Sequence, residues 1–193
     1  MKKILSDYEL LQKFINGEQS CFGELIHRHK NKVYAYIAMY IRDQALAEDI
    51  FQDTFLKVIQ SVRTGRYSDN GRFLPWVMRI AHNLIIDHFR KQRQMNVLLN
   101  DDYDSDLFNT KSLADRNIED IMVRSQIRRD VRKLISSLPD DQKEVVILRH
   151  YTGLSFKEIA DITGVSINTA LGRMRYALIN MRKLMQEKQI ILN

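Results

Sequence analysis

Residues that break helices are rare in this chain, which has two prolines and seven glycines among its 193 residues. Long stretches therefore carry no local signal that would end a helix. Within them apolar residues recur every three or four positions, as in ALAEDIFQDTFLKVIQSV, where they form a wide stripe. Hydrophobic residues make up 45% of the chain, which is enough for a packed core. The sequence thus predicts an all-α fold.

Charge is distributed unevenly along the chain. The net charge is +5 over residues 1–95, −3 over residues 96–118 and +4 over residues 119–193. The middle segment is rich in Asp, Asn and Ser and has little apolar periodicity, which is typical of a linker. The sequence predicts two basic helical domains, residues 1–95 and 119–193, joined by a flexible acidic linker.

The overall charge favours an acidic partner. The formal net charge is +6 and the pI about 9.4, values that fit nucleic acid and an anionic membrane equally well. The N-terminus lacks the apolar core of a signal peptide, and no apolar run approaches the roughly 20 residues of a membrane span. Cys21 is the only cysteine, which excludes an intrachain disulfide or a cysteine-based zinc site. We expect a soluble cytoplasmic protein in which Cys21 is a small buried hydrophobe.

Residues 155–178 have the pattern of a helix-turn-helix motif. Ser155 and Glu158 have the spacing of a capping box, and Gly164 stands where the first helix must end with a positive φ. Ser166 is positioned to cap the second helix, and Ala160 is small enough for a tight crossing. An ordinary helical hairpin has the same outline. The second helix is basic, with no acidic residue between positions 162 and 186, which favours DNA binding.

The second helix of such a motif lies in the major groove of DNA. We expect Ser166, Ile167, Asn168, Leu171, Gly172 and Arg175 to point outward, and Val165 and Ala170 inward. Asn168 has the chemistry to pair with adenine, Arg175 with guanine or phosphate, and Leu171 with a thymine methyl group. Thr169 and Arg173 are expected to bind phosphate.

A second candidate nucleic-acid surface lies in the segment GRFLPWVMRIAHNLIIDHFRKQRQ. It combines aromatic and cationic residues: Phe73, Trp76, Phe89, Arg72, Arg79, Arg90, Lys91 and Arg93. Cations beside flat apolar side chains suit single-stranded DNA, whose unstacked bases need a surface on which to lie. The alternative is that Trp76 and Phe89 belong to the helix core.

The segment AEDIFQDTF has a different character. Glu48, Asp49, Gln52 and Asp53 form a polar and acidic ridge on a helix whose other side is apolar. An acidic ridge repels DNA, so it is a candidate for protein docking. The alternative is a plain solvated surface.

Taken together, these segments resemble the extracytoplasmic-function (ECF) class of bacterial RNA polymerase sigma factors. AEDIFQDTFLKVI looks like the polymerase-docking helix of that family, and RFLPWVMRIAHNLIIDHFRK looks like its helix that melts and reads the minus-10 element. LPDDQKEVVILRHYTGLSFKEIADITGVSINTALGRMRYALINMRK looks like its minus-35-reading domain. Three motifs in this order are far more specific than one helix-turn-helix.

The resemblance implies roles for particular residues. The polymerase-binding residues, on the β′ clamp helices, would be Asp49, Gln52, Asp53 and Phe55. The minus-10 DNA-binding residues would be Arg66, Arg72, Trp76, Arg79, Asn83, Asp87, Arg90 and Lys91. The minus-35 DNA-binding residues would be Ser166, Asn168, Thr169, Leu171, Arg173 and Arg175, in a domain that also meets the β flap of the polymerase.

The resemblance also implies roles for the connecting segments. The loop TGRYSDNGR would capture a base extruded from the duplex, and the acidic linker would run through the RNA path of the polymerase. There Asp101, Asp102, Asp104 and Asp106 would mimic a phosphate chain. An anti-sigma factor, often at the membrane, is a further implied partner. No cofactor, metal or small-molecule substrate is expected.

The second helix departs from the family pattern. Many members have a basic residue followed by serine where this chain has Leu171 and Gly172, and Tyr176 and Ala177 stand where a second basic residue is usual. With fewer polar side chains to contact base edges, this helix would depend more on phosphate contacts and on DNA shape. A known minus-35 sequence therefore does not transfer to this chain.

Three other classes of protein compete with this interpretation. For an enzyme, the five histidines form no convincing metal pair, and no glycine-rich phosphate loop is present. They are His27, His29, His82, His88 and His150. A helix-turn-helix repressor or activator would bind duplex DNA tightly without polymerase. A helical adaptor would show no salt-dependent DNA binding.

Overall fold

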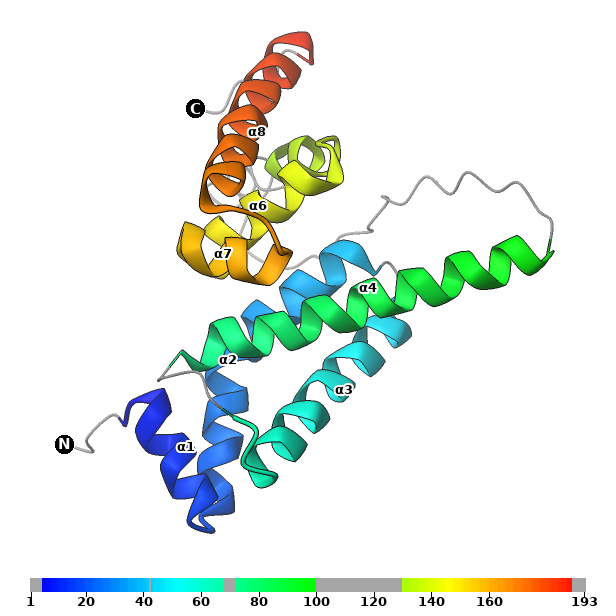
Figure 1. Ribbon diagram of the computed structural model, residues 1–193. Helices are drawn as coiled ribbons and strands as arrows, with labels where there is room; N and C mark the ends of the chain where they lie inside the picture. Colours follow the sequence, from blue (N-terminus) through cyan, green and yellow to red (C-terminus); the bar gives the residue numbers. More distant parts are fainter. Residues whose placement is uncertain (1–4, 42, 68–71, 100–129, 189–193) are drawn as a thin grey trace, which may run out of the picture. The chain divides into compact units, whose positions relative to one another are not determined.

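The computed structural model describes residues 5–41, 43–67, 72–99 and 130–188. All regular secondary structure within these ranges is helical, which confirms the predicted all-α fold. The chain divides into two compact units, Met1–Leu107 and Phe108–Asn193. Helices α1 to α4 belong to the first unit and α6 to α8 to the second (Figure 1). No described helix has both the length and the apolarity needed to span a membrane.

The predicted linker lies only partly within the described residues. Helix α4 continues to Leu99 and so runs past residue 95, the predicted end of the first domain. Residues 100–118, with the four aspartates assigned to the RNA path, lie outside the described residues. So do residues 119–129 of the predicted second domain and residues 68–71 of the loop before α4.

Helix α1 (Asp7–Ile15) begins at a capping box. The backbone N–H of Glu9 donates to Ser6 Oγ at 3.2 Å, and that of Ser6 donates to a Glu9 carboxylate oxygen at 2.7 Å. Two of the donors left open at the helix start are thereby satisfied. Gly17, with φ of 107°, then turns the chain into α2 (Gln19–Tyr40).

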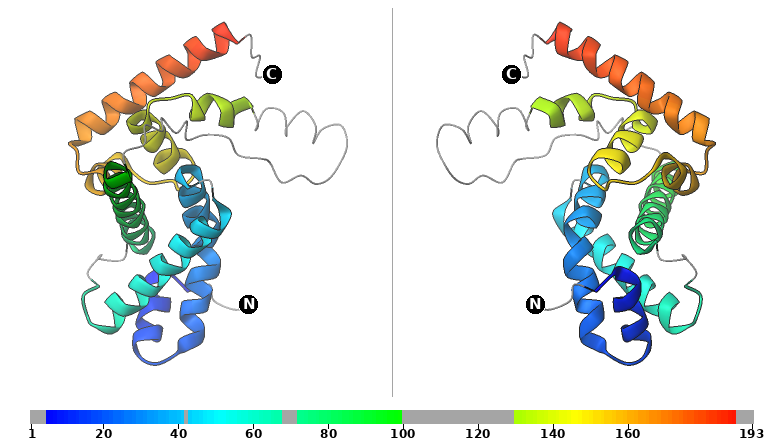
Figure 2. Two further views of the ribbon diagram at one scale, coloured as in Figure 1. Left: turned by 90° about the vertical axis from the view of Figure 1, so that its right-hand side faces the viewer. Right: turned by 90° about the vertical axis from the view of Figure 1, so that its left-hand side faces the viewer.

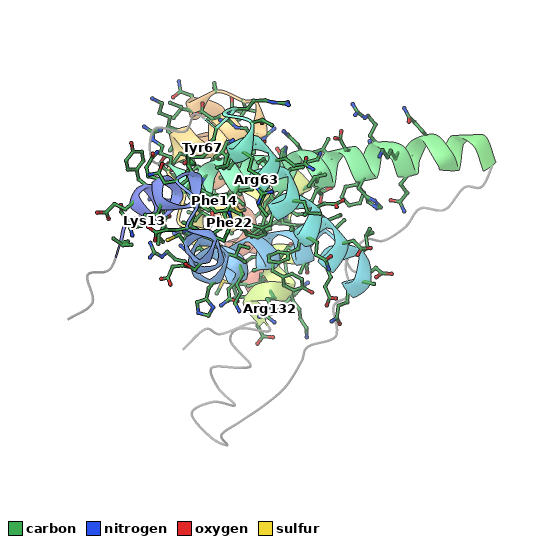
Figure 3. All side chains as sticks on the ribbon, turned by 90° about the horizontal axis from the view of Figure 1, so that it is seen from below. Lys13, Phe14, Phe22, Arg63, Tyr67 and Arg132 are labelled. Atoms are coloured by element: carbon green, nitrogen blue, oxygen red, sulfur yellow. The ribbon has the colours of Figure 1, made fainter. Side chains whose placement is uncertain are left out.

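Polar and aromatic contacts hold α1 against α2. The carboxylate of Asp7 accepts a hydrogen bond from Arg28 Nη1 at 2.6 Å and lies 2.7 Å from His29 Nε2. The rings of Phe14 and Phe22 pack with centroids 4.8 Å apart (Figure 3). Cys21, which directly precedes Phe22, is buried as predicted, and burial raises the pKa of its thiol.

Helices α3 (Gln44–Arg63) and α4 (Phe73–Leu99) complete the first unit. Both pack against α2 and against each other. The core between them contains fully buried side chains from all three helices: Val33, Ile37, Val58, Phe73, Val77, Met78 and Ala81. The C-terminal part of α4 extends beyond α2 and α3 (Figure 1), and residues 91–94 on it are exposed.

The second unit contains α6 (Asp140–His150), α7 (Phe156–Thr163) and α8 (Ile167–Glu187), and residues 130–136 are also helical. In Figure 2, α7 lies beside the N-terminal end of α8, and α6 packs along α8. Arg149 stabilises the segment between α6 and α7 through two contacts. Its Nη1 donates a hydrogen bond to the carbonyl of Leu154 at 2.8 Å, and its guanidinium lies 5.2 Å from the ring centroid of Phe156.

The turn between α7 and α8 has the predicted chemistry. Ser155 and Glu158 form a reciprocal capping box at the start of α7. Gly164 ends α7 in the left-handed conformation, with φ of 68° and ψ of 29°. The Oγ atom of Ser166 accepts from the backbone N–H of Thr169 at 3.0 Å and so caps α8. The sequence therefore predicts both helices and the turn between them correctly.

Replacing Gly164 by Ala should destabilise the second unit by about 1 kcal/mol, because an L side chain is strained at a φ of 68°. Asn tolerates the left-handed region better, so Gly164→Asn should cost less. Urea unfolding of the full chain, followed by circular dichroism, measures both changes. Asp161→Ala, an exposed change on α7, is the control and should stay within about 0.5 kcal/mol of wild type. Equal stability of the Ala variant and wild type would contradict this role.

Candidate polymerase and nucleic-acid interfaces

One long face of α3 is polar and exposed. Glu48, Asp49, Gln52 and Asp53 all lie on it, while Ala47, Ile50, Thr54, Phe55 and Val58 on the opposite face are buried. We call the exposed side chains of Asp49, Gln52, Asp53 and Leu56 the α3 ridge. Because its backing is a packed core, the ridge is a rigid surface with carboxylates at helical spacing.

The apolar member of the α3 ridge differs from the one expected. Phe55 is only 5% exposed, and its ring packs on those of Phe22 at 6.5 Å and Phe51 at 5.0 Å. It belongs to the core and supports the ridge from inside. The next residue, Leu56, is 54% exposed. Leu56 is therefore the aliphatic side chain available for contact. Its position three residues after Asp53 places it on the same helix face, which the sequence alone could have indicated.

The outer face of α4 carries the polar residues singled out in the sequence. Arg79, Asn83, Arg90 and Lys91 are exposed, and Asp87 is half-buried. Arg90 donates to the Asp87 carboxylate at 2.7 Å. Both partners of this pair are largely solvent-accessible, so the pair contributes about 1 kcal/mol at most and is readily exchanged.

Sequence reasoning missed an apolar residue on this face of α4. Ile86 is 50% exposed and lies three residues after Asn83 and four before Arg90, so it shares their stripe. The motif FRKQRQ indicates a charged surface but says nothing of Ile86. The outward position of Ile86 follows only once Val77, Ala81 and Ile85 are known to form the buried face of the helix.

The aromatic residues near the start of α4 have mixed environments. Trp76 is half-buried, with its ring 4.6 Å from that of Tyr67 and 6.2 Å from that of Phe73. Phe89 is also half-buried. Both residues thus share in packing, as the core interpretation holds, and both retain an accessible part. Arg66 and Arg72 are exposed on either side of the loop before α4.

Helix α8 presents the outward residues that the helix-turn-helix pattern predicts. Ser166, Ile167, Asn168, Thr169, Leu171 and Arg175 are exposed. Ala170 is fully buried and Val165 half-buried. The Oγ atoms of Ser166 and Thr169 lie 2.8 Å apart, so the hydroxyl groups at this helix end are already ordered.

Two residues of α8 behave differently from the sequence-based expectation. Arg173 is half-buried, and its Nε lies 3.3 Å from a carboxylate oxygen of Asp141 on α6. Arg173, which the sequence assigns to a phosphate contact, therefore also forms an ion pair within its own unit. Tyr176, which the sequence marks only as a departure from the family pattern, is 61% exposed and is the most accessible of the large apolar side chains described.

Gly172, which the sequence pattern also places outward, is half-buried on the outer face of α8. A glycine inside a helix destabilises it by roughly 0.5–1 kcal/mol relative to alanine. A Cβ atom added at Gly172 would meet no atom within 4 Å. Packing within the second unit therefore does not require glycine at this position.

Comparison with known proteins relates both units to one family. The family model described as Sigma-70 region 2 matches residues 25–95, and the model described as Sigma-70, region 4 matches residues 128–175. RNA polymerase sigma factor CarQ of Myxococcus xanthus is 33% identical, over 93% of this chain and 98% of that protein. ECF RNA polymerase sigma factor SigW of Bacillus subtilis is 27% identical, over 89% and 92%.

Solved structures show the same fold. CnrH, in complex with the cytosolic domain of CnrY, matches with a TM-score of 0.65 and 22% identity over 94% of this chain and 97% of that one. The sigma factor RpoE of Bartonella quintana, in complex with the anti-sigma factor NepR, matches with a TM-score of 0.61 and 22% identity over 86% and 96%.

The matches span both units in the order that the sequence motifs predict. A helix-turn-helix regulator that is not a polymerase subunit is not favoured, because region 2 precedes region 4 in this chain and the full-length relatives are sigma factors. The chain belongs to the ECF class of bacterial RNA polymerase sigma factors.

Proposed function

We propose that this chain binds core RNA polymerase in the cytoplasm through the α3 ridge and directs it to promoters through α4 and α8. It acts as an initiation factor and not as a catalyst. The single observation that carries this proposal is the distribution of charge over exposed helix faces. The face of α3 is acidic, whereas those of α4 and α8 are basic, and each is backed by a packed core.

The α3 ridge has the chemistry of a protein-docking surface. Asp49 and Asp53 would be repelled by DNA phosphates but attracted to cationic side chains of a protein. Leu56 adds an exposed aliphatic group, which loses water when a partner covers it. Charged residues around an apolar anchor are the usual composition of a specific protein interface.

The outer face of α4 suits the minus-10 element in its melted form. Arg79, Arg90 and Lys91 supply charge for the phosphates, and Asn83 and Asp87 supply hydrogen-bonding groups for base edges. Trp76, with Arg66 and Arg72 near it in sequence, offers an accessible aromatic edge for an unstacked base. Recognition and melting are coupled here, because base contacts on a single strand offset the cost of unpairing.

The exposed face of α8 suits the major groove at the minus-35 element. Asn168 and Leu171 lie in its first turns and would reach base edges, while Arg175 would reach guanine or phosphate. Ser166 and Thr169 sit at the N-terminal end, where backbone N–H groups and hydroxyls favour a phosphate.

An anti-sigma factor is a further proposed partner. The matched structures of CnrH and RpoE contain the proteins CnrY and NepR, the second of which is described as an anti-sigma factor. A partner that covers the faces used for polymerase and promoter would hold this chain inactive. We propose regulation of this kind here.

Transcription with purified components tests the proposed function. We expect the full chain, mixed with sigma-free bacterial core polymerase and a promoter library, to start transcripts at a defined subset of promoters. The measurement is sequencing of the RNA 5′ ends, with core alone as the control. A profile unchanged from that of core alone would refute the proposed function, as would tight promoter binding by the free chain without polymerase.

Reversing the charge at Asp53 tests the docking surface. Asp53→Lys should weaken core binding more than about tenfold, since a like charge placed against a cationic partner costs more than 1.4 kcal/mol. Fluorescence anisotropy of the labelled full chain against core measures the affinity. Glu24→Lys makes the same charge change at an exposed position of α2 and should bind nearly as wild type. If Asp53→Lys retains core affinity, the α3 ridge is not the docking surface.

Two substitutions in α8 separate base reading from phosphate contact. Asn168→Ala should reduce holoenzyme discrimination between a cognate and a scrambled minus-35 element by about 1–3 kcal/mol. Arg173→Ala should weaken both duplexes alike and lower the salt slope by about one. Asp141→Ala removes the acidic partner of Arg173 and should strengthen binding to both duplexes, the opposite of Arg173→Ala. Equal losses on both duplexes for Asn168→Ala would defeat its assignment as a base reader.

A further inference from the structure

Gly172 is half-buried and lies on the outer face of α8. The residues two positions before and after it, Ala170 and Met174, are buried, so Gly172 points the opposite way. Asn168 and Tyr176, one turn away on either side, are both exposed. The three positions form a row in which a residue with no side chain separates two accessible ones.

The fold itself gives no reason for a glycine at this position. Gly17, Gly65, Gly153 and Gly164 all have positive φ values, which L residues rarely adopt. Gly172 has no such value, and the space over its Cα is open. Alanine fits there without strain and is the better helix former, so the isolated chain would be more stable with it.

We propose that Gly172 is the point of closest approach of α8 to duplex DNA, where the missing Cβ lets the helix backbone reach the base edges of the major groove. This inference rests on the proposed function of α8. A helix with side chains is about 10–12 Å across and the major groove about 12 Å wide. One Cβ on the face that points into the groove therefore decides how deeply the helix is seated.

The neighbours of Gly172 fit this seating. Leu171 is exposed beside it and would meet a thymine methyl group once the helix lies deep in the groove. Arg175 follows within one turn and Tyr176 one turn on, and both are exposed. Before Glu187, α8 has no acidic residue that would repel the phosphates on either side.

The chain offers a matched control in Gly23. It also lies inside a helix, α2, lacks a positive φ, and has open space where a Cβ would be, and it is exposed whereas Gly172 is half-buried. Gly23→Ala and Gly172→Ala are therefore the same physical change made in different units. Both should raise the melting temperature of the full chain's corresponding transition, by roughly 4 °C.

The two substitutions should differ in their effect on promoters. With core polymerase and promoters selected by the wild-type chain, Gly172→Ala should lower output about tenfold, an effect of about 1.4 kcal/mol. On the same promoters with a scrambled minus-35 element it should have little effect. Gly23→Ala should match wild type on both templates. If Gly172 had a purely structural role, Gly172→Ala would not make the protein more stable and at the same time weaken its use of promoters.

Each other outcome overturns the inference. If Gly172→Ala is more stable and still distinguishes intact from scrambled minus-35 elements as well as wild type, the helix does not approach DNA closely at this point. If Gly23→Ala loses as much output as Gly172→Ala, the loss is not specific to α8. If the wild-type chain starts no transcripts with core, the proposed function fails, and this inference fails with it.

Discussion

Burial of one stripe on each long helix is the constraint on which the rest of this structure depends. On α3 the stripe runs through Ile50, Thr54 and Val58, and on α8 it runs through Ala170, Met174 and Ala177. Once these stripes are buried, helical periodicity determines which residues face outward. The acidic and basic faces are thus consequences of core packing, and a register shift of a single residue would rotate them by about 100°.

The local signals were sufficient to predict the elements that end sharply. Ser155 with Glu158 forms the predicted capping box, and Gly164 has the left-handed conformation that the turn requires. Such motifs depend on a few neighbouring residues, so the sequence determines them directly. The end of α4 has no such signal. The helix continues to Leu99, past residue 95, where the sequence predicts the first domain to end.

Interactions between helices were harder to predict than the helices themselves. Phe55 and Leu56 are adjacent and both apolar, but Phe55 packs against Phe22 of α2 and is buried, whereas Leu56 is exposed. Arg173 looks like a free cation until α6 brings Asp141 within 3.3 Å. The burial of Lys143, which is 1% exposed, was likewise not predicted, although its partner Asp140, at 3.0 Å, lies only three residues away on the same helix. These outcomes depend on distant segments meeting in space.

Acidic residues beside the arginines proposed to bind DNA bear on how tightly the free chain holds DNA. Asp87 pairs with Arg90, and Asp141 pairs with Arg173, so two cations that would attract phosphate are each partly neutralised. Since binding of phosphates follows the number of charges neutralised, each such pair lowers the affinity for any duplex. Contacts to base edges are weakened less than contacts to phosphates, because Asp87 can still accept a hydrogen bond from cytosine. We infer that this arrangement suppresses non-specific binding by the chain alone, so stable promoter contact depends on the polymerase to hold both units against DNA.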